Sequence, residues 1–277
     1  MTAGVTRRTL LGGVSALGFA GAVRAQDGPA EMAADWLPGA PGDRWRNIVR
    51  MQSSTREENV PWWYTGRIYA QIGNQEPQHL FNLEGTEIYW PRELPDGSFA
   101  TSSRTLTFFR DRDSGAMLRE FRNPFTGALN KVAANRLGGR DDSIYSAAGW
   151  RFADAAFSAT AEPEPWQVEW RRAGDLAWYT SSRFSRILPQ PWLESMTAFC
   201  AEAALRDTTV HNLPSHFTST YLSPWPSWME MGDRPGHLVW HSSGRKLASV
   251  EQIPVEYRRR VDAEYGGVLT AHPDSWN

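Results

Sequence analysis

The side chains best suited to moving protons lie near the C-terminus, between residues 211 and 241. His216, Tyr221 and Glu230 supply an imidazole, a phenol and a carboxyl group, which are groups that commonly act as general bases and acids. We predict that His216 acts as the base and Tyr221 or Glu230 as the acid. These three residues form the candidate catalytic set.

The loop over residues 219–236 is dense in tryptophan, methionine and proline. Prolines stiffen a loop, while tryptophan and methionine give adaptable apolar contact. This composition fits a wall or lid over a hydrophobic or aromatic ligand, and it fits equally a plug of core residues that seals one end of the fold. The predicted ligand-binding residues are Trp63, Arg67, Trp225, Trp228, His237 and His241.

An arginine on a strand can play either of two roles. If Arg67 points into the fold, its guanidinium could bind an anionic group of the substrate in a bidentate manner. The ordinary alternative is an outward, solvated side chain, because arginine is rarely fully buried.

Three imidazoles near the C-terminus raise the question of a metal site. His216, His237 and His241, with Glu230 or Asp233 as an oxygen ligand, could bind zinc, copper or iron. His237 and His241 are four residues apart on an expected strand, which separates them by about 13 Å at about 3.3 Å per residue. That separation is too large for one ion, so no metal is expected here. No organic cofactor is expected either, since glycine-rich nucleotide-binding runs and common hydrolase motifs are absent.

The N-terminus has the pattern of an export signal. Arg7 and Arg8 precede a small, apolar run that ends near Ala25, which predicts a twin-arginine signal peptide over residues 1–25, cleaved on export to the periplasm. An ordinary secretory signal is the alternative. The apolar run is shorter than the roughly 20 residues that span a bilayer, so no stable membrane anchor is expected. The export machinery would be a transient partner.

The composition narrows the class of the remaining chain. Residues 26–42 resemble a flexible arm, and residues 43–277 are expected to form one domain. The whole chain has a net charge of −2, and loss of Arg7, Arg8 and Arg24 with the signal peptide would make it −5, which argues against nucleic acid as a partner. Fourteen tryptophans predict a large core, a ligand pocket, or both. The single cysteine, Cys200, has apolar neighbours and is expected to be buried and free.

Successive aromatic and β-branched runs separated by turns predict an antiparallel, mainly β domain. The expected strands are 62–72, 79–90, 104–110, 117–122, 129–134, 143–152, 166–172, 176–184, 216–221 and 237–242. Turns at 111–115 and 123–127 would place three of these strands side by side in one sheet as a meander. Helices are expected over 193–205 and 254–264, with a further short one near 45–51. About ten short strands indicate a barrel-like or sandwich architecture, with the helices at its periphery.

Two stretches carry a family resemblance. Thr105–Asp111 with the turn at 123–127, and later Trp228–Gly236, resemble an uncharacterised bacterial and fungal family catalogued as domain of unknown function 1838. The resemblance covers about residues 45–273 and implies no catalytic residues. Its strand-and-turn pattern is similar to calycin-like β-barrels, which often hold small apolar ligands.

Three functional hypotheses follow. The first is a cofactor-free lyase, isomerase or cyclase that acts on a hydrophobic or aromatic small molecule inside the barrel. The second is a periplasmic binding or carrier protein that uses the same pocket without chemistry. The third is an interaction protein whose tryptophans all belong to the core.

Overall fold

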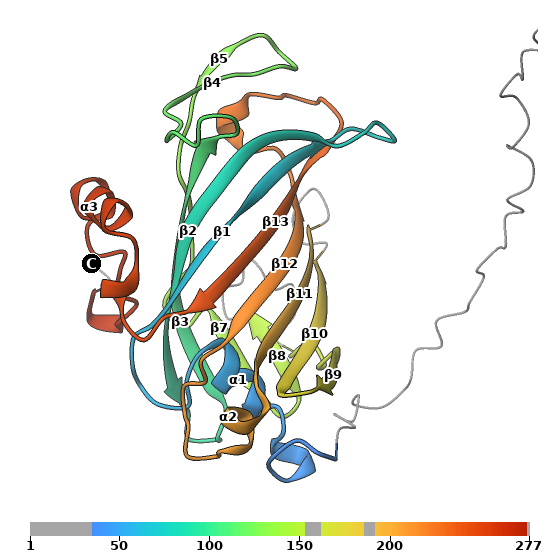
Figure 1. Ribbon diagram of the computed structural model, residues 1–277, viewed down its shortest axis with the longest axis vertical. Coiled ribbons are helices and arrows are strands. Elements are labelled where there is room, and N and C mark those ends of the chain that lie inside the picture. The colour runs from blue at the N-terminus through green and yellow to red at the C-terminus, as the bar shows by residue number, and fades with distance from the viewer. Residues whose placement is uncertain (1–34, 153–161, 186–191, 276–277) are drawn as a thin grey trace, which may run out of the picture.

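The computed structural model describes residues 35–152, 162–185 and 192–275 (Figure 1). The predicted signal peptide lies outside these residues. The strands are β1 Val60–Gln71, β2 Gln78–Glu93, β3 Phe99–Asp111, β4 Glu120–Arg122, β5 Leu129–Lys131, β6 Asn135–Leu137, β7 Ser143–Ser146, β8 Gly149–Phe152, β9 Val168–Ala173, β10 Leu176–Ser185, β11 Trp192–Ala201, β12 His216–Ser223 and β13 His237–Lys246. The α-helices are α1 Arg46–Gln52, α2 Glu202–Arg206 and α3 Val255–Glu264. Short 3₁₀ turns are η1 Pro41–Asp43, η2 Ser227–Met229, η3 Val250–Gln252 and η4 Pro273–Ser275.

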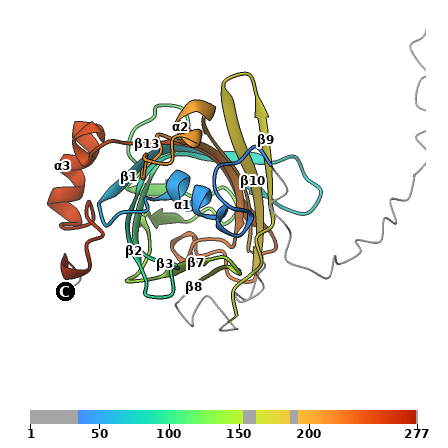
Figure 2. The same ribbon diagram turned by 90° about the horizontal axis from the view of Figure 1, so that it is seen from below.

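One large antiparallel sheet dominates the molecule. Its order is β8-β7-β3-β2-β1-β13-β12-β11-β10-β9, with β6 paired to β3. The prediction of a mainly β, antiparallel fold is therefore confirmed. The strands curve around α1 (Figure 2), but no closed barrel is detected among the described strands. A single bridge joins Trp150 at the β8 edge to Glu164, in the segment that leads into β9.

Alternation along the strands divides the sheet into an inner and an outer face. On β1, Tyr64, Ile68 and Ala70 are buried on the inner face, whereas Thr65 and Arg67 between them are exposed. This two-residue period is expected for a sheet with one face on the core.

A glycine allows one aromatic ring to lie flat against the inner face. A Cβ at Gly85 would come within 2.5 Å of the Tyr64 ring, so only glycine fits beneath it. The Tyr64 hydroxyl reaches across to the Thr107 hydroxyl at 2.7 Å. The ring thus bridges β1 to β3 over β2.

Helix α1 fills the lower end of the curved sheet (Figure 2). Ile48, Val49 and Met51 are fully or almost fully buried there. Leu37 joins the same cluster and Trp36 packs against it. Part of the predicted flexible arm therefore contacts the core.

Two basic side chains hold the lower helices: the half-buried Lys246 joins β13 to the end of α1, and the buried Arg50 joins α1 to α2. Lys246 at the end of β13 donates from Nζ to the carbonyls of Arg50 (2.8 Å) and Ser53 (2.6 Å), at the C-terminus of α1. Arg50 in turn donates to the carbonyls of Leu205 (2.9 Å), in α2, and Val210 (2.7 Å). Helix C-termini leave carbonyls without partners and carry partial negative charge, which both cations satisfy. Burial lowers the pKa of Lys246 well below its usual value.

The upper end is covered by the β4–β5 hairpin and η2 (Figure 1). Trp228 of η2 packs against Phe81, Phe109 and Phe121, with ring centroids 5.3–6.1 Å apart. The predicted meander is thus wrong in one respect, because β4 and β5 form a separate two-stranded sheet. The hairpin leaves the main sheet to bury Phe121 over this aromatic cluster.

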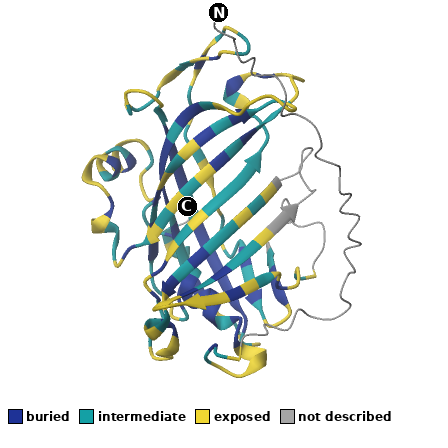
Figure 3. Cartoon of the chain, turned by 45° about the vertical axis from the view of Figure 1, so that its right-hand side comes forward, coloured by how far each residue is buried: buried dark blue, intermediate teal, exposed yellow. Residues whose placement is uncertain are grey.

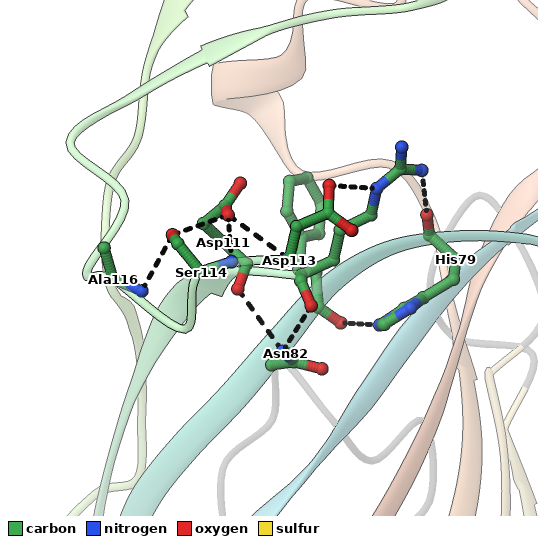
Figure 4. Close-up of polar contacts among 8 residues, drawn as sticks. His79, Asn82, Asp111, Asp113, Ser114 and Ala116 are labelled. Carbon is green, nitrogen blue, oxygen red and sulfur yellow. Dashed lines mark hydrogen bonds and ion pairs between the residues drawn. The ribbon is translucent and has the colours of Figure 1, made fainter.

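The turn predicted at 111–115 is present and is held by side chains (Figure 4). The Asp111 carboxylate accepts hydrogen bonds from the Ser114 amide (2.7 Å) and hydroxyl (2.7 Å) and from the Asp113 amide (3.2 Å). The Asn82 amide bridges the carbonyls of Asp111 and Arg112. The bonds from Ser114 hold the pKa of Asp111 below its usual value.

The helix predicted over 254–264 is present as α3. It covers the outer face of β2 and β3. Tyr257 and Val261 are buried against Ile88 and Phe108 of the sheet. The Tyr257 hydroxyl donates to the Leu106 carbonyl at 2.6 Å. This part of the outer face is therefore core rather than surface.

The helix predicted over 193–205 is wrong. Strand β11 occupies most of this range and only the short α2 follows it. Met196, Ala198 and Cys200 point inward at the two-residue period of a strand. The apolar residues of this segment also fit the period of a helix, and pairing with β10 and β12 on both sides stabilises the strand. Cys200 is buried and free, as predicted. The single strand expected at 143–152 is the hairpin β7–β8.

We expect Lys246→Met to lower the free energy of unfolding by about 1–3 kcal/mol, because it leaves the Ser53 carbonyl without its donor, whereas the Arg50 carbonyl keeps the Leu213 amide at 3.0 Å. The chain has one other lysine, the exposed Lys131, so Lys131→Met is a matched control that should change stability by less than about 0.5 kcal/mol. Urea unfolding followed by tryptophan fluorescence measures both. Equal effects of the two substitutions would contradict the capping role of Lys246.

Candidate functional site

A cavity of about 370 Å³ opens on the inner side of the sheet beside α1. Aromatic and aliphatic side chains make up somewhat more than half of its wall, and the polar remainder is Gln52, Glu164, Gln167, Ser181 and Ser182. Its lining includes Ile48, Trp150, Trp166, Val168 and Tyr179. Pockets of this size and lining are typical of small-molecule sites.

Hydrogen bonds fix the aromatic walls of this cavity. Trp166 donates its indole N–H to the Ser146 carbonyl at 2.8 Å, and its ring stacks with Tyr145 at 6.1 Å. The Gln52 amide donates to the Tyr179 hydroxyl at 2.7 Å. The rings are therefore held in place before any ligand binds, which reduces the entropic cost of binding.

An acidic group, Asp142, lies beside β3 and outside the lining of the cavity. Ser103 of β3 donates its hydroxyl to the Asp142 carboxylate, and the Gly139 amide donates to the same carboxylate at 2.9 Å. Burial raises the pKa of Asp142 to about 6, and these hydrogen bonds only partly oppose the shift. Burial and the nearby Glu87 carboxylate raise the pKa of Tyr89 well above its usual value. The side chain of Asp142 can therefore exchange a proton near neutral pH.

The loop that carries Asp142 has a constrained backbone. A Cβ at Gly138, where φ is +106°, would lie 2.2 Å from the Ser103 carbonyl oxygen. Asp141 has φ +48°, which is uncommon for a residue other than glycine, and it pairs with Arg92 at 2.9 Å. Such conformations often occur at functional sites.

The three predicted catalytic residues do not come together. His216 is exposed on the outer face, where it stacks on Phe199 at 5.4 Å. Tyr221 points to the inner face of the same strand and stacks on Trp240 at 4.9 Å. Residues five apart on a strand face opposite sides. Glu230 is exposed at the end of η2, so the geometry does not support a shared proton-transfer site.

The three predicted tryptophans are likewise dispersed. Trp63 is on the outer face against Tyr257, with centroids 4.9 Å apart. Trp225 packs on Phe125 at 5.7 Å, in the upper loop. Trp228 fills the upper aromatic cluster. The loop over 219–236 therefore contributes core residues to the upper end of the fold.

Arg67 and His241 do lie together, but on the outer face. Both line an open groove of about 550 Å³ that crosses β1, β13, β12 and β11. His241 Nδ1 is 2.8 Å from the Thr220 hydroxyl. His237 sits half-buried at the start of β13, opposite Gln71. Among the described residues, no group of three or more His, Cys, Asp or Glu side chains is placed to hold a metal ion.

Sequence reasoning missed the residues that line the cavity. Trp150 and Trp166 belong to the tryptophan excess that the composition showed, but no local pattern distinguishes them from the other twelve. Asp142 lies in the acidic pair of a Gly-Gly-Arg-Asp-Asp run, which reads as a solvated turn. Only the pairing of this loop with β3 buries it.

Two segments of the chain, residues 57–137 and 166–274, match one family model. The chain belongs to the DUF1838 family. The family is described as "Protein of unknown function (DUF1838)". The matched segments include β1–β3 and β9–β13, whereas Asp142 and Trp150 lie between them. The predicted family membership is thus confirmed.

Other comparisons add little to the family assignment. No curated protein matches the chain. A solved structure described as "Crystal structure of MucB in complex with MucA(peri)" shares 13% identity, with 80% of this chain and 97% of that chain covered and a TM-score of 0.11. Such a low score supports no structural argument. None of the described helices has the length and apolar character needed to cross a membrane.

We expect Asp142→Asn to flatten the pH dependence of stability. Because the folded pKa is raised to about 6 from 3.8, the stabilising protonation is complete below about pH 4 and is lost as the pH rises through 6. The wild type should lose about 1–3 kcal/mol over this window relative to Asp142→Asn. Urea unfolding at pH 4, 5, 6 and 7 measures the difference.

The matched control is Asp262→Asn, at an exposed position on α3. Its stability should run parallel to that of the wild type at every pH. If Asp142→Asn also runs parallel, the carboxyl group of Asp142 ionises in the folded protein as it does in the unfolded chain.

Proposed function

We propose that this DUF1838 protein is an exported protein that binds a hydrophobic or aromatic small molecule in the cavity beside α1. The observation that carries the proposal is the cavity itself, which has an aromatic wall fixed by hydrogen bonds and a volume of about 370 Å³. Most of the binding free energy would come from apolar contact with the rings, and a few polar groups would orient the ligand.

The polar groups suggest where a ligand would be oriented. Gln52 uses its amide N–H toward Tyr179, which leaves its amide oxygen as an acceptor. Ser181 adds a hydroxyl to the same wall. We therefore favour an aromatic ligand that carries one hydrogen-bond donor, such as a phenol or an amine.

Export through the twin-arginine route remains part of the proposal. Its support is the Arg7-Arg8 pair and the following apolar run. We also infer a barrel-like enclosure of the cavity. The support for it is the bridge between Trp150 and Glu164, which joins one sheet edge to the segment before the other.

A second candidate function is cofactor-free acid–base chemistry, as in a lyase or isomerase. Asp142 favours it, because its pKa of about 6 and its contact with Ser103 suit proton exchange near neutral pH. Tyr145 stacks on Trp166 of the cavity wall, and Tyr145 and Asp142 both act electrostatically on Tyr89, which supports a position of Asp142 near this wall. An enzyme would convert a bound ligand only with Asp142 intact, whereas a carrier would return it unchanged.

We expect Val168→Trp to abolish ligand binding by filling the cavity. The probe is N-phenyl-1-naphthylamine, a neutral aromatic dye whose fluorescence rises in apolar surroundings, titrated into the purified protein. The substitution should raise the dissociation constant of the dye at least about tenfold, since the added ring occupies the volume that the dye would fill. The matched control, Val255→Trp, adds the same ring at an exposed position of α3 and should leave binding unchanged.

A second variant guards against a folding defect in Val168→Trp. Ser181→Leu adds fewer atoms to the same wall and should weaken binding in the same direction. Circular dichroism verifies that each variant is folded. Unchanged dye affinity in folded Val168→Trp and Ser181→Leu would show that the cavity is not the binding site.

A further inference from the structure

A second concave surface lies on the opposite side of the sheet from the cavity. This groove of about 550 Å³ crosses the outer face of β1, β13, β12 and β11, which lie side by side in Figure 1. Exposed positions recur along these strands (Figure 3). Because the sheet separates the two sites, the groove does not depend on the proposed function of the cavity.

The charged side chain of the groove is positive, and no acidic side chain lines it. Arg67 is exposed and makes no hydrogen bond or ion pair with any described residue. No aspartate or glutamate is among the residues that line the groove, although protein surfaces usually mix both signs. An arginine with an uncommitted fork of donors suits a carboxylate, sulfate or phosphate group.

Hydroxyl groups form rows across the strands. The strand register places four hydroxyl-bearing residues directly opposite one another on adjacent strands, which lie about 4.8 Å apart. These residues are Thr65, Ser243, Thr218 and Thr197. A second row is formed by Arg67, His241, Thr220 and Ser195. Each hydroxyl can both donate and accept a hydrogen bond. Such rows match a ligand that itself carries many hydroxyl groups.

Ring geometry and backbone approach complete the groove. Tyr69 lies at one end with its ring 5.7 Å from that of His241, and its apolar face can contact the C–H groups of a sugar ring. The Thr220 hydroxyl fixes the His241 imidazole. A Cβ at Gly66 would lie 2.1 Å from the His241 carbonyl oxygen, so glycine is required for β1 and β13 to approach here.

We propose that this groove binds an acidic oligosaccharide, with the guanidinium of Arg67 on an anionic group of the sugar and the serine and threonine side chains of both rows on its hydroxyl groups. The anionic group is a carboxylate or a sulfate. The length of the groove across four strands fits several linked sugar rings rather than a single small anion.

The test is isothermal titration calorimetry of the purified protein at low ionic strength. The probes are a galacturonic acid oligomer and a sulfated dextran oligomer, which separate the two anionic groups, together with neutral dextran and orthophosphate. We expect saturable binding of at least one acidic oligomer. Arg67→Ala should weaken it about tenfold or more, since a charge-assisted hydrogen bond is lost. Thr220→Val should weaken it by a smaller factor of about three to ten.

Arg245→Ala is the matched control. Arg245 is on the outer face of the same strand as His241, is exposed, and lies outside the groove. Its removal should leave affinity within about twofold of the wild type. Equal loss in Arg67→Ala and Arg245→Ala would mean unspecific attraction of polyanions and overturn the proposal.

The remaining outcomes are also decisive. Orthophosphate that binds as tightly as the oligomers would reduce the groove to an anion site, and neutral dextran that binds as tightly would remove the role of Arg67. Absence of saturable binding to either acidic oligomer would overturn the proposal outright. Val168→Trp, which fills the inner cavity, should leave oligomer binding unchanged, so failure here is separate from failure of the cavity proposal.

Discussion

The fold depends on a short helix held inside a curved sheet by two basic side chains, Lys246 from the sheet and Arg50 from the helix itself. Helix α1 has only seven residues, too few to be stable alone in water. Lys246 holds its C-terminal carbonyls, and Arg50 extends the same pattern to the end of α2. Both side chains are largely withdrawn from water, and the carbonyl oxygens around them offset part of that cost. Without these contacts the lower end of the sheet would lack its cover.

With the lower end closed by α1 and the upper end by the Trp228 cluster, the inner face divides into layers. The upper layer is packed aromatic core, whereas the layer beside α1 retains a cavity with rigid walls. The outer face is divided as well. Helix α3 buries β2 and β3, which leaves β11–β13 open with their polar groove. The same sheet thus presents an apolar hollow inside and a polar one outside.

Most of the strands, the α3 helix and the Asp111 turn could be predicted from local pattern, because each has a residue period or a turn residue that fits one type of element. Two features escaped it. Residues 193–201 carry apolar side chains that fit either period, and only pairing with β10 and β12 decides for a strand. The candidate site could not be found because Trp150, Trp166 and Asp142 come from separate turns and edges that meet only after the sheet curves. Residues 211–241 are rich in side chains that could do chemistry, which predicted a site there. Alternate residues of its strands face opposite sides of the sheet, so these side chains do not meet.

The use of lysine in this chain has a practical consequence. Arginine supplies nearly all of the basic side chains, and of the two lysines one is enclosed by carbonyl oxygens while Lys131 is exposed on β5. An amine-reactive fluorophore should therefore attach, within the described residues, preferentially to the exposed Lys131. That position is on the hairpin that covers the tryptophan-rich upper end. Energy transfer from the indoles to such a dye would report opening of the hairpin without any engineered cysteine.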